Sequence, residues 1–255
     1  MMDLEKRPNP SSWARLMDLA LPILGHVFPT LDPAGQPTWT LGGGTAIALR
    51  IVHRVSDDVD LFVGATDLRL FTPTRNGSAA RLSADMQFPG NYLKFLMKEG
   101  EIDFLPGPLM TEPGFTLERF RGTTIALQTS EEVILKKVRY RATTFKPRDI
   151  FDLAAVARTS GTLGASLMLE TGDRLPTLLT AIQRHDAQSF GKAQINPLPG
   201  FESLMNTALA EATDYVNDLI DPPKGKKRPL RMPQQDSTQP QSKEPSALTH
   251  TDGST

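Results

Sequence analysis

The chain has 255 residues and a mass of 28.0 kDa, which is enough for one large domain or two small ones. It contains no cysteine, and this excludes zinc ribbons, iron–sulfur clusters, a cysteine nucleophile and a disulfide-stabilised fold. No apolar run approaches the roughly 20 residues that span a bilayer, and the polar start is unlike a signal peptide. We therefore expect a soluble, cytoplasmic protein that does not enter a membrane.

The first half of the chain predicts an α/β arrangement. A helix is expected over 12–28, where apolar residues follow one stripe, and a short strand over 38–41. Three glycines follow that strand, and helical character resumes over 45–53. The alternation of polar and apolar residues over 58–63 then predicts a half-buried strand.

Further strands are expected before residue 128. Alternation occurs over 82–88, and two more candidates, 91–97 and 101–105, flank a three-residue hairpin loop that ends in Gly100. Ile125 and Leu127 indicate another strand. We expect these strands to form a mixed, largely antiparallel sheet.

The second half predicts helices. Thr129 and Glu132 form a capping-box pattern that opens a helix through about residue 141, and Pro147 suits the first turn of a helix over 148–158. Helical pieces follow over 163–185, and a long amphipathic helix over 201–220. The predicted organisation is an α/β domain at 1–128 with an N-terminal helix, a helical domain at 129–221 and a tail at 222–255.

The tail differs in composition from the rest. It carries six basic residues against three acidic ones, six prolines and no aromatic residue. Such a segment cannot bury enough apolar surface to offset its ordering entropy, so we expect disorder. Because the net charge of the whole chain is −1, the body carries −4, which does not indicate a general nucleic-acid binder.

Two carboxylates stand out within the predicted strand 58–63. Asp58 and Asp60 are two residues apart, so both side chains project from one face of the strand. Neighbouring carboxylates repel each other unless a cation lies between them, and Mg²⁺ prefers oxygen ligands. Asp103 supplies a third carboxylate if its strand lies beside this one. The alternative is a solvated strand face, because exposed Asp is common.

The glycine turn is the second candidate feature. Gly43, Gly44 and Thr45 lie between a predicted strand and a predicted helix, where backbone N–H groups are able to bind phosphate. The turn has neither the Rossmann nor the P-loop spacing, so those two classes are excluded. Taken alone, it is equally consistent with a simple tight turn.

The combination of the two features resembles the nucleotidyltransferase superfamily related to polymerase β. More narrowly, LGGGTAIALRIVHRVSDDVDLF over 41–62 resembles the signature of the AbiEii/AbiGii toxin family. LKKVRYRATTFKPRDIFDLAAV over 135–156 is similar to a second family block, which matches at Lys137, Arg148, Asp149 and Asp152. Tyr140 and Arg141 depart from it, since the family usually has Ala-Leu there.

This resemblance implies an α+β fold, in which a nucleotidyltransferase sheet with flanking helices precedes a C-terminal helical bundle. It also implies that Asp58, Asp60 and Asp103 hold Mg²⁺ in a two-metal site and that Asp103 activates the attacking hydroxyl. Lys137 and the turn at Gly43, Gly44 and Thr45 would bind the phosphates of an NTP. Arg148, Asp149 and Asp152 would line the nucleotide pocket, or the two aspartates would form a structural ion-pair network instead.

The acceptor is predicted from local charge. Residues 119–148 hold eight basic residues against two acidic ones, which suits a polyanion such as the 3′ end of a tRNA. The predicted activity is therefore transfer of a nucleotide to RNA by the toxin of a toxin–antitoxin or phage-defence pair, with a separately encoded antitoxin. The alternatives are nucleotidylation of a small molecule or protein, and a catalytically silent nucleotide- or RNA-binding module.

Overall fold

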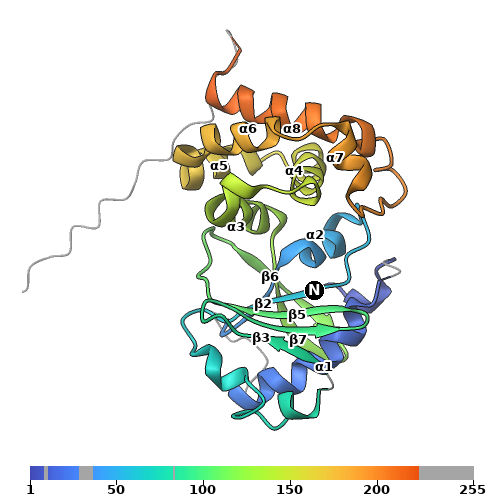
Figure 1. Ribbon diagram of the computed structural model, residues 1–255, viewed down its shortest axis with the longest axis vertical. Coiled ribbons are helices and arrows are strands. Elements are labelled where there is room, and N and C mark those ends of the chain that lie inside the picture. The colour runs from blue at the N-terminus through green and yellow to red at the C-terminus, as the bar shows by residue number, and fades with distance from the viewer. Residues whose placement is uncertain (9–10, 29–36, 83, 224–255) are drawn as a thin grey trace, which may run out of the picture.

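The computed structural model describes residues 1–8, 11–28, 37–82 and 84–223. Within them a single mixed sheet has helices on both faces, and a helical part lies beyond one face (Figure 1). The strand order is β3-β4-β5-β2-β1-β7-β6. The strands are β1 Thr40–Leu41, β2 Val59–Phe62, β3 Asp85–Gln87, β4 Leu93–Met97, β5 Gly100–Leu105, β6 Phe115–Phe120 and β7 Thr123–Gln128.

The sheet is mixed and largely antiparallel, as predicted. Only β1 with β7 and β2 with β5 pair in parallel, and the other four neighbouring pairs are antiparallel. In β2, Val59 and Leu61 are fully buried while Asp60 and Phe62 are partly exposed on the opposite face. The alternation seen in the sequence therefore separates a core face from a face on which polar groups lie.

The helix α1 Trp13–Val27 covers the core face of the sheet and contains Pro22 without ending there (Figure 1). On the other face, α2 Gly43–Ile51 packs between the sheet and the helical part. The remaining helices are α3 Ser130–Arg141, α4 Pro147–Thr159, α5 Leu163–Thr171, α6 Leu175–Gln183, α7 Ala187–Lys192 and α8 Leu204–Ile220. Five short 3₁₀ turns complete the described elements: η1 Leu4–Lys6, η2 Leu68–Phe71, η3 Ala79–Arg81, η4 Ala142–Thr144 and η5 Gly172–Arg174.

The structure confirms the α+β class, and most elements lie where the sequence predicts them. Two were not predicted, namely β6 and α7. β6 and β7 form a hairpin whose two-residue turn, Arg121 and Gly122, has positive φ at both positions (50° and 78°). β7, the last strand along the chain, ends at Gln128, and α3 begins at Ser130. Buried side chains before and after this boundary nevertheless belong to one continuous hydrophobic core. The three-part division thus stays a prediction.

The predicted tail lies, from residue 224 onward, outside the described residues. None of the helices in the described ranges is both long and apolar enough to cross a membrane.

Candidate active site

The three predicted carboxylates come together on one face of the sheet. Asp60 on β2 pairs in register with Asp103 on β5, so the two side chains are cross-strand neighbours. Asp58 directly precedes β2, and its Oδ1 accepts a hydrogen bond from the Glu101 backbone N–H at 3.1 Å. The condition set by the sequence, that the strand of Asp103 lie beside that of Asp60, is met.

These carboxylates carry more negative charge than their surroundings neutralise. Burial, followed by the charge of Asp60, raises the pKa of Asp103 to about 7. Burial and then the charge of Asp58 raise the pKa of Asp60, and burial raises that of Asp58. The Oδ1 atom of Asp103 is buried and has no hydrogen-bond partner among the described residues. Such a group is suited to bind a cation.

The glycine turn lies against the same carboxylates. Gly43 begins α2 with φ +65°, and a Cβ atom there would lie 1.7 Å from Oδ2 of Asp60. A Cβ on Gly42 would lie 2.5 Å from Oε1 of Gln128, and one on Gly44 would lie 2.4 Å from Nη2 of Arg54. Each glycine is therefore required by a specific close approach, and the start of α2 directs its first, unpaired N–H groups toward this face.

The hydroxyl of Thr45 is used in hydrogen bonds within the protein and is not available to a ligand. Its side chain is fully buried, and its Oγ1 donates to the carbonyl of Asp58 and lies 3.0 Å from Oγ of Ser56. The hydroxyl therefore fixes the segment that carries the first carboxylate. Only the backbone N–H of Thr45 remains for phosphate binding.

A cavity of about 440 Å³ opens between this face of the sheet and α3. Asp60 and Gly43 line it from one side, and Lys137 and Arg141 line it from α3. Its other wall residues are largely apolar or amide-bearing: Phe62, Asn91, Tyr92, Leu105, Pro106, Gln128, Val133, Lys136 and Tyr140. The cavity lies within the usual size range of small-ligand sites.

Lys137 belongs to a buried ion-pair network. Its Nζ lies 2.7 Å from Asp149 and 2.7 Å from Asp152. Asp152 also binds Arg54 through both carboxylate oxygens (2.7 and 3.0 Å) and lies 2.7 Å from Nε2 of His53. All five side chains are buried, and the cations of Arg54 and Lys137 hold the pKa of Asp152 well below its usual range, against the effect of burial.

The placement of Asp149 and Asp152 agrees with the ion-pair alternative that the sequence left open. Neither lines the cavity, and both lie behind Lys137. Through Arg54, whose guanidinium lies against Gly44, Asp152 braces the glycine turn. His53 accordingly positions other residues of the site and does not face the cavity.

The basic segment 119–148 does not form one surface. Lys136 and Lys137 are buried beside carboxylates, and Arg121, on the β6–β7 turn, pairs with Glu5 and Asp18. Arg119 is exposed on β6, and four other exposed basic residues lie at the end of α3 and the start of α4: Arg139, Arg141, Lys146 and Arg148. Of these, Arg141 lies 3.8 Å from Asp149. Arg148 does not line the cavity, but its charge offsets part of the rise that burial causes in the pKa of Asp58.

Sequence reasoning missed three features of the site. Lys94 on β4 is the cross-strand neighbour of Asp103, with its Nζ 3.5 Å from Oδ2 of Asp103, and it also pairs with Glu101. Gln128 donates through Nε2 to Oγ1 of Thr40 at 2.7 Å, which leaves its Oε1 buried and without a partner among the described residues. Only strand pairing reveals these contacts.

The third missed feature is a buried cation. The Nζ of Lys136 lies 3.9 Å from the centroid of the Phe62 ring and 3.1 Å from Oε1 of Glu132. Glu132 in turn accepts hydrogen bonds from the backbone N–H groups of Met110 and Thr111. Lys136 therefore ties the cavity wall to the loop that follows β5.

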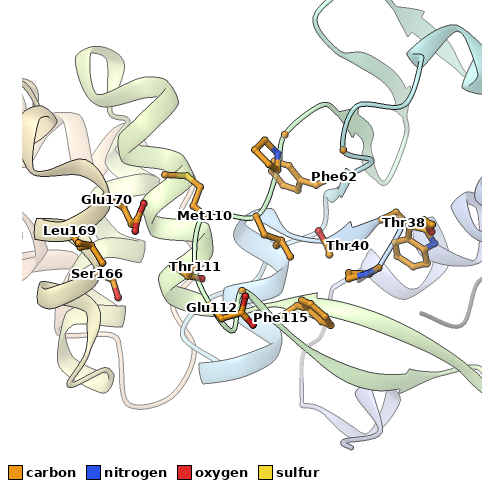
Figure 2. A pocket seen from close by; sticks show the side chains of 17 residues that line it. Thr38, Thr40, Phe62, Met110, Thr111, Glu112, Phe115, Ser166, Leu169 and Glu170 are labelled. Carbon is orange, nitrogen blue, oxygen red and sulfur yellow. The ribbon is translucent and has the colours of Figure 1, made fainter. Parts of the chain in front are cut away.

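A second, larger cavity of about 660 Å³ lies beyond Phe62, which lines both cavities. Figure 2 shows Ser166, Leu169 and Glu170 of α5 on one side of it and Thr38 on the other. None of the three predicted carboxylates lines this cavity, whereas Asp60 lines the smaller one, which is therefore the candidate active site.

The comparison with protein families agrees with this site. The model of the family described as "Nucleotidyl transferase AbiEii toxin, Type IV TA system" matches residues 30–95. The predicted AbiEii relationship is confirmed. The AbiEii family is one of toxin nucleotidyltransferases, and the predicted enzyme class is confirmed with it. The match includes the glycine turn, Asp58 and Asp60, but it ends before Asp103 and Lys137, whose assignment depends on the geometry.

Among solved structures, the chain is similar to a putative nucleotidyltransferase from H. pylori at 15% identity, with 82% of this chain and 94% of the other covered and a TM-score of 0.46. It is similar to JHP933 from Helicobacter pylori at 18% identity, with 82% and 93% covered and a TM-score of 0.43. It is also similar to the nucleotidyltransferase toxin MenT4 of Mycobacterium tuberculosis at 17% identity, with 82% and 84% covered and a TM-score of 0.48. No curated protein matches the chain.

Proposed function

We propose that this nucleotidyltransferase moves a nucleoside monophosphate from an NTP to the 3′ end of an RNA, with tRNA as the acceptor, and releases pyrophosphate. One observation supports this most directly. Asp60, Gly43 and Lys137 line one cavity, and Asp103 and Asp58 are the neighbours of Asp60 on the same face of the sheet. A set of carboxylates, a phosphate-binding turn and a cation around one cavity are the groups that phosphoryl transfer needs.

The donor set fits Mg²⁺. The three side chains supply only oxygen ligands, one of which, Oδ1 of Asp103, is buried and unpaired among the described residues. Within the described ranges, no group of three or more His, Asp or Glu side chains lies close enough together to hold a metal ion by itself. Mg²⁺ does not need one, because it usually binds through one or two carboxylates together with substrate phosphates and water. When bound by Asp58, Asp60 and Asp103, it would neutralise charge that develops on the phosphates.

The side chains of the chain itself then have distinct tasks. The N–H groups at the start of α2 bind the terminal phosphates, and Lys137 and Arg141 provide positive charge from α3. Asp103 accepts the proton of the acceptor hydroxyl. The hydroxyl oxygen forms a bond to the α-phosphorus while the bond from that phosphorus to the β-phosphate oxygen breaks, and pyrophosphate leaves.

RNA is the acceptor that the surface charge favours. Arg139, Arg141, Lys146 and Arg148 are exposed at the end of α3 and the start of α4. Arg141 lines the cavity and acts on the pKa of Asp60, and Arg148 acts on that of Asp58. An exposed group of arginine and lysine residues beside a catalytic cavity suits a phosphate backbone better than a small cationic substrate. This surface is smaller than the sequence suggested, because Lys136, Lys137 and Arg121 are held by carboxylates.

The test is labelling of RNA. Purified protein is incubated with Mg²⁺, total tRNA and each α-labelled NTP in turn, beside Asp60→Asn and the control Asp173→Asn, an exposed carboxylate of the helical part. Label that appears on tRNA with one or more NTPs, persists in the control and disappears in Asp60→Asn supports the proposal. Label on the protein or on a small molecule instead points to a different acceptor, and Mg·NTP binding without pyrophosphate release points to a silent binding module.

The cellular role follows from the family. As a toxin of a type IV system, the chain would act in the cytoplasm, where NTP and tRNA are available, and would be opposed by a separately encoded antitoxin. We propose phage defence as the setting of such a pair. Growth arrest on expression, absent with Asp60→Asn and relieved by a neighbouring gene, is the corresponding measurement.

A further inference from the structure

We propose that Tyr140 is a nucleobase-binding residue, which stacks its ring on the base of the NTP whose phosphates lie at Asp60 and the glycine turn. This inference rests on the proposed function and deepens it, because it places the base of the donor at one wall of the cavity. It also concerns this chain in particular, since the AbiEii pattern usually has Ala at this position.

The position of Tyr140 is the first support. It lies three residues after Lys137 on α3, so both side chains lie on the same side of the helix, and both line the cavity with Asp60. A Cβ atom on Gly107 would lie 3.8 Å from the hydroxyl oxygen of Tyr140. The side chain therefore extends from α3 toward the loop after β5, across the mouth of the cavity.

The exposure of the ring is the second support. Tyr140 is 61% exposed, which makes it one of the few large hydrophobic side chains of the described surface that are not covered. Across the described ranges it takes part in no hydrogen bond, ring stacking or cation–π contact. An aromatic ring that makes none of these contacts and lines a ligand cavity is suited to stack on a flat partner.

The other two aromatic rings of the cavity are less available. The Nζ of Lys136 lies 3.9 Å from the centroid of the Phe62 ring, so one face of that ring is occupied. The hydroxyl of Tyr92 donates to Oε1 of Gln87 at 3.4 Å, which ties Tyr92 to the edge strand β3. Tyr140 is therefore the aromatic residue of this cavity that is best placed to receive a base.

The cavity is lined by two kinds of residue. Gly43, Lys137 and Arg141 are the residues proposed to bind phosphate, whereas Leu105, Pro106 and Val133 form an apolar part of the wall. A base stacked on Tyr140 would lie against that apolar part while its triphosphate reaches the glycine turn. Stacking is tolerant of sequence because every base has a π face, so we expect Tyr140 to strengthen the binding of all four NTPs by similar factors.

The experiment compares ligands with and without a base. Dissociation constants are measured in Mg²⁺ by equilibrium dialysis for each of the four NTPs and for inorganic tripolyphosphate. The proteins are the wild type, Tyr140→Ala, Tyr140→Phe and the control Leu70→Ala, whose side chain is also exposed but lies on η2, which packs against α1. Because stacking on an aromatic side chain contributes about 1–3 kcal/mol per base, Tyr140→Ala should weaken NTP binding by about 5- to 150-fold.

Tripolyphosphate binding should stay unchanged in Tyr140→Ala, and Tyr140→Phe should bind NTPs as the wild type does. Equal NTP affinity in Tyr140→Ala and the wild type overturns the role of Tyr140 and leaves the proposed function intact. A parallel loss of tripolyphosphate binding also overturns it, because the residue would then act on phosphates or on folding. If the wild type binds no NTP at all, the proposed function and this inference both fail.

Discussion

Asp60 on β2 and Asp103 on β5 are direct neighbours on parallel strands, and the charge of Asp60 is, after burial, the strongest influence that raises the pKa of Asp103. Two carboxylates at this spacing, with Asp58 close by, destabilise a folded protein unless a cation joins them. The arrangement is therefore a compromise in which stability is lost to create a binding site.

This relationship gives the first prediction. Asp60→Asn should abolish nucleotide transfer, with a loss of at least about 100-fold, while the free energy of unfolding without metal stays the same or rises. The neutral amide removes a buried charge that repels both neighbours. Urea unfolding and the labelling assay are run on the same preparations. A clear loss of stability would show instead that Asp60 holds the fold together.

The glycine turn gives the second prediction. Gly43→Ala should destabilise the protein by about 1–3 kcal/mol and abolish transfer, because the new methyl group overlaps Oδ2 of Asp60 and the backbone has φ +65°. Gly122→Ala is the matched control, since its φ is +78° but no atom lies within 4 Å of the added Cβ. It should cost only about 1 kcal/mol and leave transfer intact. Equal effects would mean that strain alone, rather than contact with the carboxylate, matters at Gly43.

The third prediction concerns the buried network. Asp152→Asn should lower the free energy of unfolding by about 3–5 kcal/mol, because Arg54 and Lys137 are left buried with too little negative charge. The control Glu211→Gln removes the ion pair with the largely exposed Arg158 and should cost less than about 1 kcal/mol. Chemical denaturation with a constant m-value separates the two effects. A cost at Asp152 no greater than at Glu211 would argue that the network does not support the fold.

The same network predicts the pH dependence of stability. Burial lowers the pKa of His53, so the folded protein keeps this imidazole neutral while the unfolded chain binds a proton below about pH 6.5. His53 therefore contributes a loss of stability as the pH falls from about 6.5. Asp103, whose pKa is raised to about 7, and Asp60 and Asp58, whose pKa values are also raised, contribute in the opposite direction, because the folded state binds their protons before the unfolded chain does. The pKa of Asp152 is depressed, so this residue adds a further loss below about pH 4.

Relative to the wild type, His53→Gln should therefore become progressively more stable as the pH falls from 6.5 to 5, while the loss due to Asp152 below about pH 4 is kept. The measurement is urea unfolding at half-unit pH steps in wild type and variant. A profile of the variant that runs parallel to the wild type above pH 5 would show that His53 does not cause the loss.

The sequence predicted the parts of the site that are close together along the chain. The D-x-D spacing placed Asp58 and Asp60 on one face, and the glycines marked a turn whose tightness the structure explains through Asp60 and Arg54. Contacts between segments that are distant along the chain could not be predicted from the sequence. Lys94 meets Asp103 only because β4 pairs with β5, and Gln128 reaches Thr40 only because β7 lies beside β1. The hairpin of β6 was missed because Glu118, a charged residue, is buried within it.

Basic charge was the least predictable feature, for a physical reason. A run of lysines and arginines does not show which of them meet carboxylates after folding, and Lys136 and Lys137 are adjacent in sequence but differ in partners. Lys137 is held by both Asp149 and Asp152, whereas Lys136 lies between the ring of Phe62 and Glu132.

This difference gives the last prediction. Burial lowers the pKa of Lys136, and its partner Glu132 keeps hydrogen bonds from the backbone N–H of Met110 and from both the N–H and the hydroxyl of Thr111. Lys136→Met should therefore change the free energy of unfolding by no more than about 1 kcal/mol, since an apolar side chain of similar length replaces a buried charge.

Lys137→Met, by contrast, leaves Asp149 and Asp152 with less positive charge nearby. It should lower the free energy of unfolding by about 2–4 kcal/mol and should also abolish nucleotide transfer. Urea unfolding and transfer of labelled nucleotide are measured for both variants in parallel. The matched substitutions also decide which of the two lysines corresponds to the lysine of the AbiEii pattern. Loss of transfer in Lys136→Met with normal stability, and its retention in Lys137→Met, would assign that role to Lys136.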